Sequence, residues 1–338
     1  MAKKRVVYFD LLNICAALCV IFLHCNGKAR DYSETIGWYH ALGVEVICFW
    51  AVPIFLMLTG ATLMGYREKY TTKEFFKRRV LRTVIPFVIW SLINAVVKFV
   101  NPFTIGWGEF INRFFFSSIE NVYWFFIPLF SVYLSLPILS LLKDNRKVLW
   151  YMAGGAFILN STLPAIFSYM DLGWNSHFTM MTVNGYLIYP VIGYLLATTD
   201  FSKLQRVIIY CLGAGGAAIR YFATIFLTRQ DGKINLTFFS YTGYYAVMLA
   251  VAVFVFFKYS SIGERMGNSE KASKLISKIS SCSFGIYLIH MFILRVFARV
   301  MVTGTWYWRM LIPFAIYAIA FVIVNLAKKI PVIKKIFP

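Results

Sequence analysis

The sequence has few charged residues, and acidic ones are especially scarce. Only 14% of its 338 residues are Asp, Glu, Lys or Arg, and just 14 residues are acidic. An average globular protein has about a quarter charged residues. With 60% hydrophobic residues the chain does not have the composition of a disordered protein. The net charge of +20 would suit a nucleic-acid-binding protein, but the apolar content would not. Composition therefore indicates a polytopic membrane protein with basic loops, in contact with the lipid bilayer and not with nucleic acid.

Cysteine is scarce as well. The six residues (15, 19, 25, 48, 211 and 282) show no paired spacing. A disulfide-rich scaffold would need more of them in a shorter chain, and no metal motif occurs among Cys and His. We predict apolar packing roles for the cysteines, no metal site and no tightly bound cofactor.

Ten apolar stretches reach the roughly 20 residues that a membrane-spanning helix needs. They cover residues 9–27, 41–65, 80–100, 122–142, 148–166, 180–199, 207–227, 238–257, 282–301 and 307–328. Pro164 and Gly185 interrupt the fifth and sixth, so eight or nine spans remain an alternative. The sequence predicts an all-α membrane bundle of about ten transmembrane helices, forming a single domain over residues 1–338.

The basic residues assign sides to this topology. If the N-terminus is cytoplasmic, ten spans place 23 of the 34 Lys and Arg residues in cytoplasmic segments and five in outer loops. This split follows the positive-inside rule and puts both termini in the cytoplasm. The first span follows basic residues as a signal peptide would, but it has no small-residue cleavage site, so we expect a retained helix.

Polar residues inside the first span are candidates for function, because ionisable groups are costly in a bilayer. Asp10 and Asn13 lie near its cytoplasmic end and His24 at the other end. Asn13 and His24 are eleven residues apart, about 16 Å along a helix and close to three turns, so they share a face. His24 is either an ordinary interfacial histidine or a proton acceptor at the mouth of a cavity.

Two further features have alternative interpretations. His290 lies about mid-span in the ninth stretch and serves either a structural hydrogen bond or function. Lys77, Arg78 and Arg79, with Arg82 one turn later, lead into the third span. This cluster either anchors the topology or binds a phosphate-containing donor, since the Arg fork suits phosphate geometry.

Five motifs in order resemble those of the acyltransferase 3 family of integral membrane acyltransferases. They are Tyr8-Phe9-Asp10-Leu11-Leu12-Asn13 with Leu23-His24, Val52-Pro53-Ile54-Phe55-Leu56-Met57-Leu58-Thr59-Gly60, Phe76-Lys77-Arg78-Arg79-Val80-Leu81-Arg82, Tyr123-Trp124-Phe125-Phe126, and Ser283-Phe284-Gly285-Ile286-Tyr287-Leu288-Ile289-His290. One departure is Asn13, where many members have Arg. If that Arg helps to hold the donor, another cation such as Arg79 or Arg82 must replace it.

The resemblance implies transfer of an acyl group, by family default acetyl, from cytoplasmic acyl-CoA to a hydroxyl of a cell-surface glycan or its lipid-linked precursor. It implies a multi-pass protein of a bacterial plasma membrane, with acetyl-CoA as co-substrate. His24 would be the catalytic base. Donor binding would involve Arg78, Arg79, Arg82, Asp10 and Asn13. The residues expected to line the cavity or stabilise an oxyanion are Tyr123, Trp124, Tyr287 and His290.

Asp10 lies about 20 Å from His24 by helix rise, so we expect it to pair with a cytoplasmic Arg instead of orienting His24. A variant of the mechanism passes the acyl group through a covalent enzyme intermediate. A transporter or flippase of a polar or lipid-linked substrate is the alternative function, and a non-catalytic partner of a glycan assembly machine is a third. The sequence leaves open whether the chain forms a homo-oligomer.

Overall fold

The computed structural model describes residues 6–116 and 119–337, and within them the secondary structure is helical, with no β-strand. The α-helices are α1 (Val7–Cys25), α2 (Ile36–Cys48), α3 (Ala51–Leu63), α4 (Thr72–Arg79), α5 (Ile85–Val97), α6 (Pro102–Ile105), α7 (Trp107–Phe115), α8 (Phe126–Leu139), α9 (Arg146–Ala156), α10 (Leu163–Tyr169), α11 (Ile188–Thr198), α12 (Lys203–Asp231), α13 (Tyr244–Tyr259), α14 (Ser261–Asn268), α15 (Glu270–Val300), α16 (Trp306–Met310) and α17 (Ile312–Ala327). The predicted all-α membrane bundle is confirmed. Lys3, Lys4 and Arg5 of the predicted cytoplasmic charge lie outside the described residues.

Within the described part, six helical stretches are long and apolar enough to cross a membrane. They are Val7–Cys25, Ile36–Glu68, Thr72–Val97, Asn121–Leu142, Lys203–Asp231 and Glu270–Val300. The pair α13 and α14, bent by 42°, would add a seventh, and Gly185–Thr198 and Ile312–Ala327 are shorter apolar helices. Each of the ten predicted stretches is largely helical, but the number of crossings stays a prediction.

Several predicted spans are interrupted for reasons that the sequence contains. A turn at Phe49 and Trp50 separates α2 from α3, and Pro53 lies in the first turn of α3, where its missing N–H costs no helical hydrogen bond. A π-helical turn, Val80–Val84, joins α4 to α5. Pro86 follows it and has no N–H to donate to the carbonyl of Arg82, which favours this local widening.

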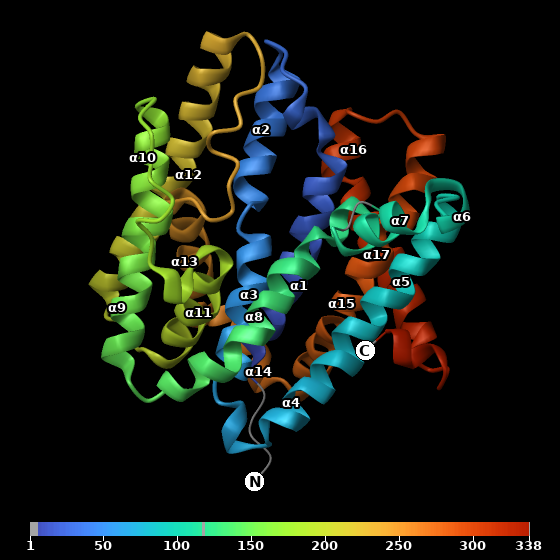
Figure 1. Cartoon of the computed structure of the whole chain (residues 1–338), viewed down its shortest axis with the longest axis horizontal. Helices are drawn as coiled ribbons and strands as arrows, with labels where there is room; N and C mark the ends of the chain where they lie inside the picture. Colours follow the sequence, from blue (N-terminus) through green and yellow to red (C-terminus); the bar gives the residue numbers. More distant parts are fainter. Residues whose placement is uncertain (1–5, 117–118, 338) are drawn as a thin grey trace.

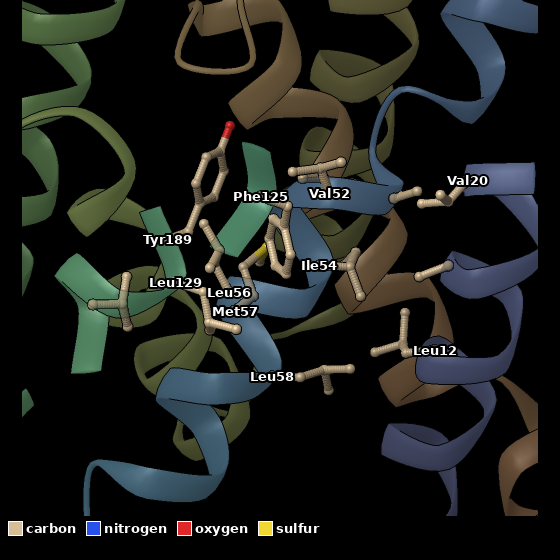
Figure 2. Packing of buried hydrophobic residues seen from close by; sticks show 14 of the residues in the cluster. Leu12, Val20, Val52, Ile54, Leu56, Met57, Leu58, Phe125, Leu129 and Tyr189 are labelled. Carbon is tan, nitrogen blue, oxygen red and sulfur yellow. The ribbon is translucent and has the colours of Figure 1, made fainter. Parts of the chain in front are cut away.

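The helices that form the site pack around α3 (Figure 1). α1 packs against α3 and α15, α11 packs against the other side of α3, and α15 also packs against α17. α1 and α3 run antiparallel: Figure 2 shows Val20 and Val52 at one level of the bundle and Leu12 and Leu58 at another, with Phe125 near the level of Val52. The start of α1 and the end of α3 therefore lie at the same end of the bundle as α4 and α14 (Figure 1).

Candidate functional site

A cavity of about 400 Å³ lies next to the junction of α4 and α5. Its walls come from the first turns of α1, the second half of α3, the junction of α4 and α5, the start of α8, and α15. Five of the predicted site residues line it: Asp10, Asn13, Arg79, Arg82 and Tyr287. The sequence motifs that contain these residues are thus brought together around one space.

The arginines of the basic cluster differ in their position relative to this cavity. Arg79 and Arg82 line it, and the guanidinium of Arg79 lies 5.6 Å from the ring centre of Tyr133, which lines it too. Arg78 is not among the lining residues. Its Nε donates to Glu74 at 2.9 Å, and its guanidinium stacks over Tyr70 at 4.4 Å. Arg78 was predicted to bind the donor, but it does not line this cavity.

Asn13 joins α1 to α15 at the cavity wall. Its side-chain amide donates to the carbonyl and to the hydroxyl of Ser280, both at 3.0 Å. The amide is thus held by the protein, and Asn13 brings no positive charge. The cations that share the wall with it are Arg79 and Arg82. Positive charge at this wall therefore comes from the α4–α5 junction and not from Asn13.

A second, much smaller cavity of about 40 Å³ is lined in part by His24. It is lined by the last turns of α1, the start of α3, the turn Asn121–Phe125, Tyr241 before α13, and Tyr287 of α15. Trp124 is among the residues that line it, and its ring stacks on Tyr241 with centroids 5.4 Å apart. His24 is half-buried at this point.

The two cavities lie one after the other along the bundle and share three walls. Phe55, Phe125 and Tyr287 line both of them. The ring centroids of Phe55 and Phe125 are 5.8 Å apart, and those of Phe125 and Tyr287 are 6.0 Å apart. These three rings form an aromatic partition. On one side of it lie two arginines and on the other lies one histidine.

His290 packs directly against His24. The centroids of the two imidazoles are 5.2 Å apart. Nδ1 of His290 lies 2.6 Å from the carbonyl oxygen of Tyr287, so this nitrogen carries the proton. Nε2 is buried, and in the described part of the chain it has no hydrogen-bond partner. A residue of α15 is thereby placed against the predicted catalytic residue of α1.

Tyr123 and Tyr287 fix the turn that carries Trp124. The hydroxyl of Tyr287 donates to the carbonyl of Val122, and the hydroxyl of Tyr123 donates to the carbonyl of Leu288 at 2.8 Å. This reciprocal pair ties the turn to α15. Tyr123 itself lines neither cavity. Tyr123 was predicted to line the cavity, and its position does not support that role. Its hydroxyl instead helps to clamp the turn to α15.

Sequence reasoning missed a buried ion pair behind this site. Arg220 of α12 lies 3.7 Å from the carboxylate of Glu45 in α2 and donates to the carbonyl of Phe238 at 2.8 Å. Its guanidinium covers the ring of Phe49 at 3.5 Å, and Phe49 stacks on Tyr241 at 4.0 Å. The sequence did contain an indication of this pair, because Glu45 is an acidic residue within a predicted span, where a charge needs a partner.

Glu120 was missed too. Its buried carboxylate binds Arg295 of α15 and lies 3.3 Å from Nζ of Lys98. The bond to Glu120 pairs Arg295 with a carboxylate inside the protein. Among the described residues no group of three or more His, Cys, Asp or Glu could hold a metal ion.

Comparison with known proteins gives one finding. A family model described as an acyltransferase domain matches residues 6–328. No curated protein matches the chain, and no solved structure matches it. The matched range contains both cavities and every predicted site residue.

Proposed function

The chain belongs to the acyltransferase 3 family and is a multi-pass membrane acyltransferase, and from this premise we propose the reaction that its two cavities serve. The donor is cytoplasmic acyl-CoA, the group moved is acetyl, and the acceptor is a hydroxyl of a cell-surface glycan or its lipid-linked precursor. The protein would act in a bacterial plasma membrane, with its basic loops in the cytoplasm.

This proposal rests on the order of the two cavities, which lie one after the other along the bundle. Arg79 and Arg82 line the larger cavity, and His24 lines the smaller one beyond the aromatic partition. CoA has an anionic phosphorylated head, which Arg side chains bind well. Its pantetheine arm is on the order of 15 Å long, comparable to the rise between Asn13 and His24. A donor with its head at the arginines would reach His24 with its thioester.

His24 would act as a general base in this geometry. It takes the proton of the acceptor hydroxyl, and the acceptor oxygen attacks the carbonyl carbon of the thioester. The carbon–sulfur bond then breaks, the CoA thiolate leaves, and the proton passes from His24 to the sulfur. Asp10 and Asn13 lie at the donor end of the larger cavity. Neither has to touch the reacting atoms.

A direct assay tests the enzyme against the transporter alternative. We expect the purified wild-type chain in lipid nanodiscs to release CoA from labelled acetyl-CoA and to move the label to an added glycan acceptor. A nanodisc encloses no compartment, so transport across the membrane leaves no product in this assay. Absence of both CoA binding and CoA release would contradict the proposal.

Replacement of Arg79 and Arg82 should weaken the use of the donor. Loss of one hydrogen bond to a charged group costs about 1.5–3 kcal/mol, so Arg82→Gln or Arg79→Gln should raise KM for acetyl-CoA about tenfold or more. The expected change in kcat is small, because these residues lie across the partition from His24. Initial rates over a range of acetyl-CoA concentrations give both constants.

Arg78→Gln is the matched control for this experiment. It removes the same charge from the same run of residues but from outside the cavity wall. We expect a small effect on KM, as for other exposed ion pairs. An equal rise in KM for all three variants would show that the donor responds to the general charge of this surface and not to the cavity.

A further inference from the structure

The cavity around His24 is small in comparison with the space that leads to it. It measures about 40 Å³, against about 400 Å³ on the other side of the aromatic partition. A cavity needs about 10–15 Å³ to hold one water molecule. The smaller cavity therefore has room for about three non-hydrogen atoms, which is the number in an acetyl group.

Several of the side chains that line the cavity beyond the partition are apolar and branched. Val20, Leu23, Val52 and Val122 line the small cavity together with aromatic rings, and the three valines are buried. Val20 and Val52 lie at the same level of the bundle (Figure 2). β-Branched side chains are restricted at χ1, so they do not turn away easily from a longer ligand.

The backbone that carries one wall is fixed. The carbonyl of Val122 accepts a hydrogen bond from the hydroxyl of Tyr287, and Tyr287 is itself part of the partition. The neighbouring Tyr123 bonds to α15 through its hydroxyl and to Glu120 through its backbone N–H at 2.9 Å. Val122 therefore cannot withdraw without breaking the clamp between this turn and α15.

We propose that Val52 and Val122 set the length of the acyl chain and restrict the enzyme to acetyl. The inference rests on the proposed function, because it takes acyl-CoA as the donor with its thioester at the partition. During transfer the carbonyl carbon exchanges its bond to sulfur for a bond to the acceptor oxygen. The whole acyl group, with its carbonyl carbon and oxygen, has to fit beyond Phe55, Phe125 and Tyr287, while the sulfur lies at the partition. A butyryl group has five non-hydrogen atoms and exceeds the space.

A series of thioesters tests this inference on the wild-type protein in nanodiscs. The donors are acetyl-, propionyl-, butyryl- and hexanoyl-CoA, and the readout is kcat/KM for CoA release in the presence of the glycan acceptor. One methylene too many in such a pocket lowers kcat/KM about tenfold or more. We expect kcat/KM to fall at least about tenfold from acetyl to butyryl. Equal use of acetyl- and butyryl-CoA would overturn the inference and leave the proposed function standing.

Two enlarging variants and a matched control extend the test. Val52→Ala and Val122→Ala should each raise the butyryl-to-acetyl ratio of kcat/KM about tenfold. Val132→Ala removes the same atoms from another buried position, in α8, that lines neither cavity, and it should leave the ratio unchanged. An equal rise in Val132→Ala would show general loosening and overturn the inference.

The series on the wild type tests the restriction to acetyl even if a variant does not fold. The role of Val52 and Val122 is tested by the variants that fold, and unchanged ratios in both would overturn it. A monodisperse peak in size-exclusion chromatography identifies the variants to be assayed. No CoA release from any thioester by the wild type would overturn the proposed function and, with it, this inference. Release from acetyl-CoA alone, with relaxation in the two cavity variants, supports both.

Discussion

His24→Ala is expected to reduce acyl transfer by about 10²–10⁴-fold, the usual contribution of a general base. The variant should still fold, because His24 is half-buried at the end of α1 and the buried residues of that helix remain. It should also still bind acetyl-CoA, because Arg79 and Arg82 line a different cavity from His24. The loss should therefore appear in kcat, with the donor affinity preserved.

His177→Ala is the matched control, since His177 is exposed and lies outside both cavities. Initial rates of transfer and binding of acetyl-CoA are measured for both variants and the wild type. Transfer by His24→Ala at more than a tenth of the wild-type rate would remove His24 from the role of base. Loss of donor binding in the same variant would show instead that the imidazole helps to hold the donor.

The role of His24 also predicts the direction of the pH dependence. Only the neutral imidazole accepts a proton, so kcat/KM should fall as acid protonates His24. His290 is the neighbouring titratable group, with Nδ1 directed to a carbonyl oxygen and a ring centroid 5.2 Å from that of His24. A positive charge on either ring would oppose one on the other.

The sequence predicted the helical architecture and the family because both signals are local. Apolar stretches of the required length became helices, and the resemblance in five motifs indicated the acyltransferase family. Asn13 and His24 were expected on one face of α1, and they line two cavities that follow each other along the bundle. The catalytic role of His24 and the donor-binding roles stay predictions.

Pairings between distant segments could not be read from one sequence. The ion pair of Glu45 and Arg220 joins residues far apart in the chain, as does the contact of His24 with His290. Local patterns contain no information on which buried charges meet. All three of Arg78, Arg79 and Arg82 were predicted to bind the donor, although only Arg79 and Arg82 line the cavity. The direction of a side chain on a short helix and a π-helical turn depends on local winding that composition does not reveal.

Gly60→Ala and Gly193→Ala are expected to be the most damaging single-methyl changes in the chain. A Cβ on Gly60 of α3 would lie 1.9 Å from the carbonyl oxygen of Pro190, and one on Gly193 of α11 would lie 2.1 Å from that of Met57. The two glycines thus let the backbones of α3 and α11 touch, as small residues do between membrane helices. Because backbone atoms cannot rotate away, the helices would have to separate. Overpacking of this kind costs typically 1–3 kcal/mol and occasionally more.

The displacement would reach the site, because α3 also carries Val52 and Phe55, which line the cavity at His24. Gly215→Ala in α12 is the control, since nothing lies within 4 Å of its added Cβ. Alanine favours a helix over glycine by about 1 kcal/mol, so this variant should be as stable as the wild type or more stable. Thermal unfolding in detergent, followed by size-exclusion chromatography, should give opposite signs for the two kinds of glycine. If Gly60→Ala and Gly193→Ala were as stable as Gly215→Ala, the backbone contact between α3 and α11 would be absent, and the position of Phe55 would need another support.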